Sequence, residues 1–200
     1  RRAIIPRSPI AELILKDFKP WYNGPAPQRI LDLCCGGGCI GLAAAYQFPD
    51  ARVDLLDMDS GALELACENA EYLGLKERVT VMQSDLLESL ADTRYDLILS
   101  NPPYVDAADL AAMPAEFRHE PVDALRSGSD GLDLTRRILS SIHPFLANSG
   151  LLIVEVGNSW PALEKAYPRV PFTWIEFECG GNGVFALTAK ELQDYSTIDG

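Results

Sequence analysis

Apolar runs alternate with amphipathic stretches along most of the chain. Short, almost fully apolar runs are typical of strands buried on both faces, and apolar residues spaced three or four apart are typical of helices. We expect strands at 29–34, 52–57, 78–82, 95–100 and 151–156, and helices at 8–18, 39–48, 60–73, 132–145 and 159–167. Strands that alternate with helices form parallel crossover units, so the pattern predicts a doubly wound, mostly parallel α/β sheet.

The end of the chain breaks this alternation. Two further apolar runs, 172–177 and 184–188, are separated only by 178–183. That connection is too short for a parallel crossover, so we expect a terminal antiparallel hairpin and seven strands in total. Upstream, Ser60 is the expected N-cap of the helix that Gly74 ends. The long polar segment 101–131 has no clear periodicity, and such segments are usually functional or flexible.

Composition narrows the class of protein. A length of 200 residues suits one domain, and 48% hydrophobic with 23% charged residues is globular composition. The net charge of −12 disfavours direct binding of nucleic acid and favours a basic macromolecule as partner. No apolar run reaches membrane-spanning length, so we expect no membrane contact, and the first residues do not resemble a secretory signal.

The five cysteines are Cys34, Cys35, Cys39, Cys67 and Cys179. Their number and crowding favour free thiols in a reducing cytoplasm over a disulfide framework. Neither these cysteines nor the two histidines have the spacing of zinc ligands, so we expect no metal.

A glycine-rich turn follows the first predicted strand. Gly36, Gly38 and Gly41 form a G-x-G-x-x-G pattern that opens a helix, and Asp57 ends the second strand. Glycines let a ligand approach the backbone, and a carboxylate after the second strand can accept both hydroxyls of a ribose. The pair predicts a cofactor that contains adenosine. A nicotinamide dinucleotide, and hence an oxidoreductase, stays open on this pattern alone.

Two further features discriminate between cofactors. Asp32 lies four residues before Gly36, where a carboxylate would repel a pyrophosphate but suit a ligand with ammonium and sulfonium groups. Asn101-Pro102-Pro103-Tyr104 directly follows the fourth strand. The oxygen of the Asn101 side chain and the carbonyl of Pro102 can each accept an N–H of an amide nitrogen, and the prolines stiffen the turn. Tyr104 can pack against the amide plane and exclude water.

The D-x-x-x-G-x-G pattern, the acid after strand two and N-P-P-Y together resemble the class I, Rossmann-like methyltransferases that use S-adenosylmethionine. The N-P-P-Y form is that of enzymes which methylate amide or exocyclic amino nitrogens. Pro6-Arg7-Ser8-Pro9, Arg118-His119-Glu120-Pro121 and Ser129-Asp130-Gly131-Leu132 resemble the HemK-like protein-glutamine methyltransferases. In this family Cys35 stands where threonine is usual, and Gly37 where serine or threonine is usual. Such a turn contacts the cofactor mainly through backbone groups, so we expect cofactor binding to persist despite these two departures.

The resemblance implies a site for each part of the cofactor. Residues implied at the methionine part are Gly36, Gly37, Gly38, Cys39 and Ile40, with Asp32 beside them. The ribose would meet Asp57, and the adenine would meet Asp85 and Leu86. Asn101 would contact both the cofactor and the substrate, with Pro102, Pro103 and Tyr104 completing the substrate and catalytic site. We expect Arg118 and Glu120 to position a loop or read the substrate peptide. His119 is a candidate general base, but methyl transfer to an amide needs no base beforehand, so we expect a structural role for it.

The resemblance also implies a substrate. The tail, Pro171-Phe172-Thr173-Trp174 with Gly180-Gly181-Asn182-Gly183-Val184-Phe185, resembles the branch that methylates a glutamine of ribosomal protein three of the large subunit. A sister branch acts on peptide-release factors. Three other interpretations stay open: an N6-adenine nucleic-acid methyltransferase, the oxidoreductase, and a non-catalytic cofactor-binding scaffold. We expect residues 1–200 to form one methyltransferase domain without the family's N-terminal helical domain; the oligomeric state stays open.

Overall fold

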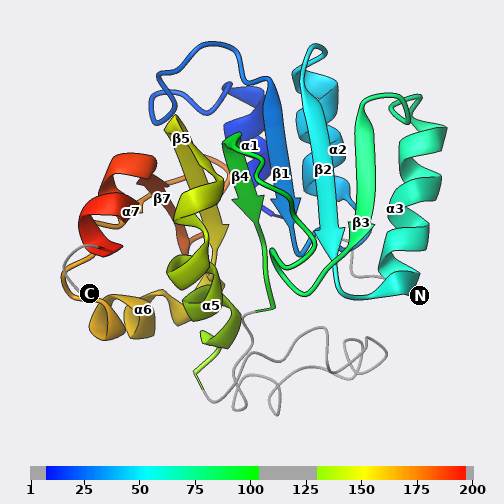
Figure 1. Ribbon diagram of the computed structural model, residues 1–200. Coiled ribbons are helices and arrows are strands. Elements are labelled where there is room, and N and C mark those ends of the chain that lie inside the picture. Colours follow the sequence, from blue (N-terminus) through cyan, green and yellow to red (C-terminus); the bar gives the residue numbers. More distant parts are fainter. Residues whose placement is uncertain (1–7, 104–129, 197–200) are drawn as a thin grey trace.

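The computed structural model describes residues 8–103 and 130–196, and its centre is a seven-stranded sheet in the order β3-β2-β1-β4-β5-β7-β6 (Figure 1). The strands are β1 (Arg29–Leu33), β2 (Arg52–Asp57), β3 (Val79–Gln83), β4 (Tyr95–Ser100), β5 (Leu146–Glu155), β6 (Thr173–Trp174) and β7 (Val184–Thr188). Neighbours among β1 to β5 pair in parallel, whereas β7 pairs antiparallel with both β5 and β6. The predicted fold class is confirmed.

The central strand β1 explains why the sequence forms a parallel sheet. Four of its five residues are buried, because it has a strand on each side and helices over both faces. Ile30 aligns with Val53 of β2 and with Leu97 of β4, and all three side chains are inaccessible to solvent. Parallel register brings the carboxyl ends of β1, β2 and β4 to one edge of the sheet.

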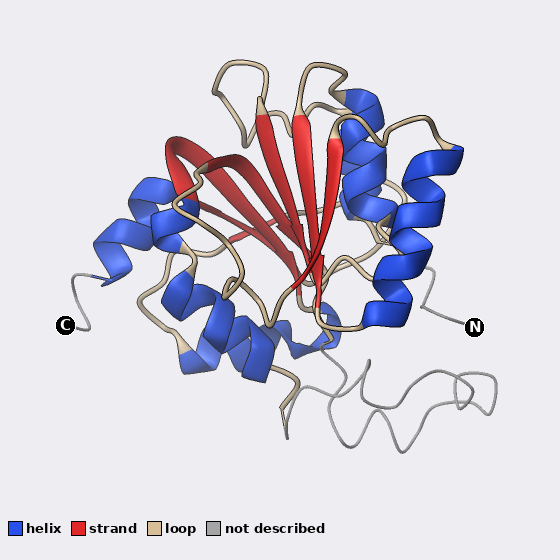
Figure 2. Cartoon of the chain, turned by 45° about the vertical axis from the view of Figure 1, so that its right-hand side comes forward, coloured by secondary structure: helices blue, strands red, loops and turns tan. Residues whose placement is uncertain are grey.

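Helices cover both faces of the sheet (Figure 2). They are α1 (Ile10–Leu15), α2 (Cys39–Gln47), α3 (Ser60–Tyr72), α5 (Asp133–Ser141), α6 (Trp160–Ala166) and α7 (Ala189–Ser196), with short 3₁₀ turns at His143–Phe145 and Gly157–Ser159. One hydrophobic cluster takes its helical residues from α1, α2 and α3. The other takes them from α5, α6 and α7 and also contains Leu86 and Leu87. Within residues 8–103 and 130–196, no helix is both long and apolar enough to cross a membrane.

Several predicted boundaries were wrong. The N-cap of α3 is Asp59 and not Ser60, since a carboxylate oxygen of Asp59 accepts a hydrogen bond from the Ala62 amide at 3.0 Å. The predicted helix 132–145 is divided into α5 and a 3₁₀ turn that contains Pro144. β5 begins earlier than predicted, and β6 is only two residues long. Helix α7 was not predicted at all.

Candidate functional site

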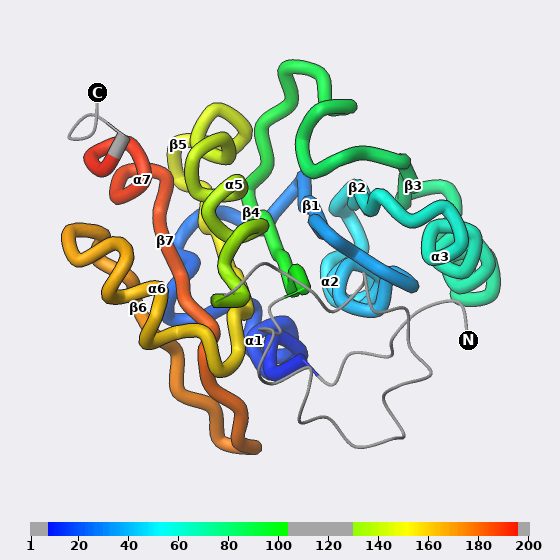
Figure 3. The backbone as a smooth tube through the Cα atoms, turned by 90° about the horizontal axis from the view of Figure 1, so that it is seen from below, coloured from blue at the N-terminus to red at the C-terminus, as the bar shows by residue number. Residues whose placement is uncertain are grey.

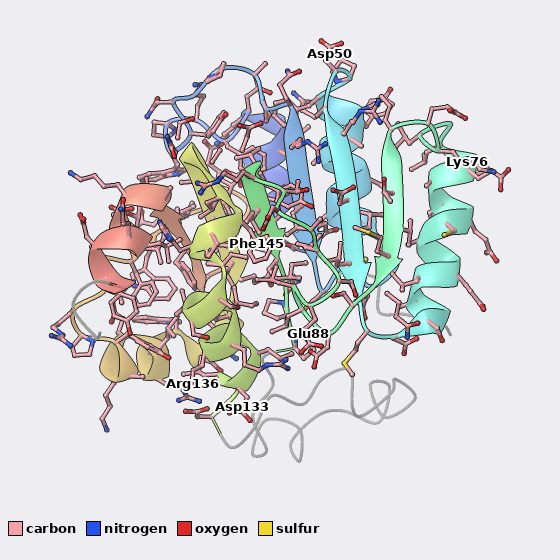
Figure 4. All side chains as sticks on the ribbon, in the orientation of Figure 1. Asp50, Lys76, Glu88, Asp133, Arg136 and Phe145 are labelled. Atoms are coloured by element: carbon pink, nitrogen blue, oxygen red, sulfur yellow. The ribbon has the colours of Figure 1, made fainter. Side chains whose placement is uncertain are left out.

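The turns that carry the predicted site residues all follow parallel strands and therefore meet at the carboxyl edge of the sheet. Figure 3 views the molecule from below, toward this edge. In Figure 4, Glu88, Asp133 and Arg136 lie near this edge, while Asp50 and Lys76 lie at the opposite one. Because β1 is flanked by β2 and β4, the turn after β1 lies between those that follow its two neighbours.

The glycine-rich turn after β1 is held by side chains from outside it. The Gly36 amide donates to Oδ2 of Asp57 at 2.8 Å, and the Asn69 side chain donates to the Gly37 carbonyl at 2.9 Å. The Gly38 amide donates to the Cys35 carbonyl at 2.8 Å. The other oxygen of Asp57 accepts from the Asp59 amide at 3.0 Å. Each carboxylate oxygen has a second lone pair, so Asp57 can still accept ribose hydroxyls while it holds the turn.

The glycines of this turn have different physical roles. A Cβ on Gly41 would lie 2.3 Å from Cδ2 of Leu55, and one on Gly38 would lie 2.9 Å from Cδ1 of the same side chain. These two glycines let α2 pack closely against the sheet. A Cβ on Gly36 would meet no heavy atom of the described residues within 4 Å, and the φ of Gly36 is +53°. The backbone at Gly36 is therefore open on the side where a ligand would approach.

Asp32 is buried beneath this turn, with an exposed fraction of 1%. Its Oδ2 accepts from the Gly41 amide at 2.7 Å, while its buried Oδ1 has no hydrogen-bond partner among the described residues. Burial raises the pKa of Asp32 to about 7, and the nearby Asp57 carboxylate adds to this effect. An unsatisfied carboxylate oxygen at this position suits a cationic group.

The first turn of α2 begins beside Asp32. Cys39 is exposed, Ile40 is buried, and the amides at the start of a helix have no intrahelical acceptor. Such amides suit an anion. Asp32 and the start of α2 together offer complementary groups for the ammonium and carboxylate of an amino acid, which is the methionine end of S-adenosylmethionine. The residues present therefore fit this cofactor.

The turn after β3 carries the two residues predicted at the adenine. The Ser84 amide donates to the Asp57 carbonyl at 2.9 Å, and this bond ties the turn to the end of β2. Asp85 is about half exposed, and its Oδ1 pairs with Nη2 of Arg137 on α5 at 2.9 Å. Leu86 is only 7% exposed and has a φ of +50°. The side chain of Leu86 belongs to a hydrophobic core cluster, which limits how much of it a ligand could contact.

The predicted substrate residues follow β4 directly. Asn101 and Pro103 are half-buried, and Pro102 is buried. The hydroxyl of Ser100 donates to the Leu33 carbonyl at 2.7 Å, so the end of β4 is anchored to the end of β1. Tyr104 lies outside the described residues, as do the predicted loop residues Arg118, His119 and Glu120. The structure thus places the asparagine and both prolines next to the glycine-rich turn.

Three other residues at this edge escaped the sequence analysis. Arg137 is distant from Asp85 in sequence, so no local pattern could have connected them.

Glu155 ends β5, is 6% exposed and accepts a hydrogen bond from the hydroxyl of Ser8 at 2.6 Å. Because Ser100 aligns with Val154, Glu155 neighbours the start of the Asn101 turn. A charged residue within the apolar run 151–156 was a usable signal for it. Met58 follows Asp57 and is 69% exposed.

All five cysteines have free thiols. Burial raises the pKa of Cys34 and Cys35 well above the ordinary thiol value, which disfavours the thiolate that reaction or metal binding would need. Among residues 8–103 and 130–196, no three His, Cys, Asp or Glu side chains are grouped so that they could hold a metal ion.

Comparison with known proteins assigns the chain to a family. The family model of the methyltransferase small domain matches residues 11–154, and the chain belongs to this family. A curated relative from Francisella tularensis subsp. tularensis (strain SCHU S4 / Schu 4), named ribosomal protein uL3 glutamine methyltransferase, is 49% identical over 97% of this chain and 62% of its own length. A relative of the same name from Neisseria gonorrhoeae (strain ATCC 700825 / FA 1090) is 47% identical over 96% of this chain and 64% of its own. The chain therefore spans less than two thirds of either relative.

Solved structures share the fold at low identity. The catalytic domain of hMettl16, solved with MAT2A 3'UTR hairpin 6, superposes with a TM-score of 0.69 at 20% identity over 94% of this chain and 73% of that one. A methyltransferase from Pyrococcus furiosus gives 0.62 at 16% identity, covering 93% and 87% of the two chains. These similarities support the class I methyltransferase fold and carry no information about the substrate.

Proposed function

We propose that this protein transfers the methyl group of S-adenosylmethionine to the side-chain amide nitrogen of a glutamine in ribosomal protein uL3. The observation that carries the proposal is the position of Asn101 and Pro102 at the end of β4, beside the glycine-rich turn of β1. This arrangement brings amide acceptors close to a site that fits the cofactor.

The cofactor would be held by residues from three turns. Oδ1 of Asp32 and the start of α2 suit the methionine end, and Asp57 suits the ribose. The open backbone at Gly36 leaves room for the part of the cofactor that connects its methionine end to its ribose. Asp85 is the predicted acceptor for the exocyclic amine of adenine.

Asn101 and Pro102 would prepare the amide for attack. The cofactor supplies an electrophilic methyl group on a sulfonium. An amide nitrogen is a weak nucleophile, because its lone pair is delocalised into its carbonyl. Two acceptors, the Asn101 side-chain oxygen and the Pro102 carbonyl, would orient both N–H bonds and direct the lone pair at the methyl carbon. Transfer would form the N–C bond as the S–C bond breaks, and the nitrogen would then lose one proton to water.

The identity of the substrate rests on the relatives and on charge. Two curated relatives carry the name of a uL3 glutamine methyltransferase, and the net charge of −12 would attract a basic ribosomal protein. We further propose that the enzyme acts in the cytoplasm, where free thiols such as its five cysteines persist. Neither a membrane nor a nucleic acid is part of this proposal.

A methyl-transfer assay tests the proposal. The protein is incubated with labelled S-adenosylmethionine and, separately, uL3, a peptide-release factor or RNA, and the label is mapped by mass spectrometry. We expect label on a glutamine of uL3. Asn101→Ala should lower kcat at least about 100-fold, because it removes a preorganised hydrogen-bond acceptor. Asn148→Ala, at an exposed position near the start of β5, serves as the matched control and should keep full activity.

The other outcomes are equally informative. Label on the release factor alone would retain the chemistry and refute uL3 as substrate. Label on RNA would overturn amide methylation. Full activity in Asn101→Ala would refute the assigned role of this residue.

A further inference from the structure

An ion pair joins the predicted adenine site to α5, the helix that begins at Asp133. Nη2 of Arg137, on α5, lies 2.9 Å from Oδ1 of Asp85. Both side chains are about half exposed, so the pair lies at the surface and contributes little to global stability. Its position at the carboxyl edge of the sheet suggests a role in ligand binding instead.

The backbone around Asp85 is already fixed by other contacts. The Ser84 amide is bonded to the Asp57 carbonyl, and the Ser89 amide donates to the Ser84 hydroxyl at 3.0 Å. Leu86 and Leu87 are both buried in the hydrophobic cluster that also contains residues of α5, α6 and α7. The remaining freedom is the rotation of the Asp85 carboxylate, and the guanidinium of Arg137 restricts this rotation.

We infer that Arg137 is a positioning residue for adenine recognition: it holds Oδ1 of Asp85 so that Oδ2 is directed to the exocyclic amine of the cofactor. This inference rests on the proposed function. A guanidinium is a suitable group for this task, because it is planar and always charged, and here its Nη2 is paired with Oδ1 of Asp85. Preorganising the acceptor lowers the entropy that is lost when the amine binds.

The neighbouring arginine provides a matched control. Arg136 lies on the same helix and pairs with Asp130 and Asp133, not with Asp85. Arg136→Gln therefore removes the same charge from the same turn of α5 without affecting the Asp85 carboxylate. A general effect of charge or helix stability would be shared by the two variants, whereas a positioning effect would be confined to Arg137→Gln.

Calorimetric titration with two ligands tests the inference. One ligand is S-adenosylhomocysteine, and the other is its analogue in which hydrogen replaces the exocyclic amine. The wild type should prefer the amine-bearing ligand about tenfold, the value of one hydrogen bond to a charged acceptor. In Arg137→Gln this preference should fall to about threefold or less, and affinity for the analogue should stay within about twofold of wild type. Arg136→Gln should keep the wild-type preference.

Each alternative result would overturn the inference. An equal loss of affinity for both ligands in Arg137→Gln would show that Arg137 only supports the fold of the site. Tighter binding of S-adenosylhomocysteine would show that Arg137 competes with adenine for Asp85. A wild type that binds both ligands equally would remove Asp85 from adenine recognition. A wild type that binds neither ligand would refute the proposed cofactor itself.

Discussion

At the scale of single residues, Asp32 combines burial with an incomplete set of hydrogen bonds. One carboxylate oxygen is bonded to the Gly41 amide, and the other is unsatisfied among the described residues. Such a group costs folding free energy in its charged form. The structure keeps it at the place where a cationic part of the cofactor fits, so the cost can be recovered when the ligand binds.

The raised pKa of Asp32 gives a pH prediction. Its pKa rises from an ordinary value of 3.8 to about 7 on folding, so between these values the folded protein holds a proton that the unfolded chain has lost. The contribution of Asp32 to stability is therefore full below about pH 4 and is lost as the pH rises through about 7. Relative to wild type, Asp32→Asn should gain up to about 4 kcal/mol in the free energy of unfolding over this range.

Urea unfolding at several pH values measures this difference. Asp50→Asn is the control, because it removes an exposed carboxylate from the opposite edge of the sheet (Figure 4). A constant difference between Asp32→Asn and wild type from pH 4 to pH 7 would contradict the prediction. If Asp32 also binds the ammonium of the cofactor, Asp32→Asn should bind S-adenosylhomocysteine more weakly even though it is more stable.

At the scale of elements, the turn between β1 and α2 must satisfy both folding and binding. A comparison of Gly36 with Gly74 separates the effect of a substitution on folding from its effect on binding. Both have positive φ, +53° and +70°, and a Cβ on either would meet no heavy atom within 4 Å in the part of the chain that the structure describes. Gly36 lies in the candidate cofactor site, whereas Gly74 follows α3 at the other edge of the sheet.

Alanine at either position should therefore destabilise the fold by about 1 kcal/mol, since a side chain strains the left-handed conformation. Only Gly36→Ala should weaken the binding of S-adenosylhomocysteine, by about tenfold or more, because its methyl group occupies the ligand's approach. Thermal unfolding measures the first effect and calorimetry the second. Equal affinities in the two variants would place the ligand away from Gly36.

The elements that the sequence predicted best are strands inside the sheet. Four of five residues are buried in β1, five of six in β4 and three of six in β2, because helices cover both faces of the sheet, and the boundaries of these strands were almost exact. Helix α7 was missed because Ala189–Ser196 is short and mostly polar, and it is stabilised by tertiary packing, mainly on β5 and β7. β6 is shorter than its apolar run because it lies at an edge and pairs only with β7.

The candidate site could likewise be predicted only in part from the sequence. The glycine turn, Asp57 and Asn101 could be predicted to lie together because each lies at or directly after the end of a strand, and parallel strands end at one edge. The contact between Asp85 and Arg137 could not be found in this way, because it depends on how α5 packs over the turn after β3. Contacts between segments distant in sequence leave no periodic pattern.

At the scale of the whole molecule, charge should govern the encounter with the substrate. The chain carries 29 acidic and 17 basic side chains, for a net charge of −12. Attraction between this surface and a basic ribosomal protein acts over distances beyond direct contact, and salt screens it, with a Debye length of about 8 Å at physiological ionic strength. Under the proposed function, the attraction would speed association, whereas the methyl-transfer step would occur within the site and would not depend on bulk salt.

We therefore expect kcat/KM for intact uL3 to fall about tenfold or more between low salt and about 0.5 M salt, with kcat nearly unchanged. A short glutamine peptide without net charge is the control, and its kcat/KM should vary less than about twofold, because it has no long-range attraction to lose. An equal salt effect on both substrates would indicate that salt acts on the enzyme itself. Independence from salt with intact uL3 would show that recognition relies on short-range contacts, and the acidic surface would then have no part in selecting the substrate.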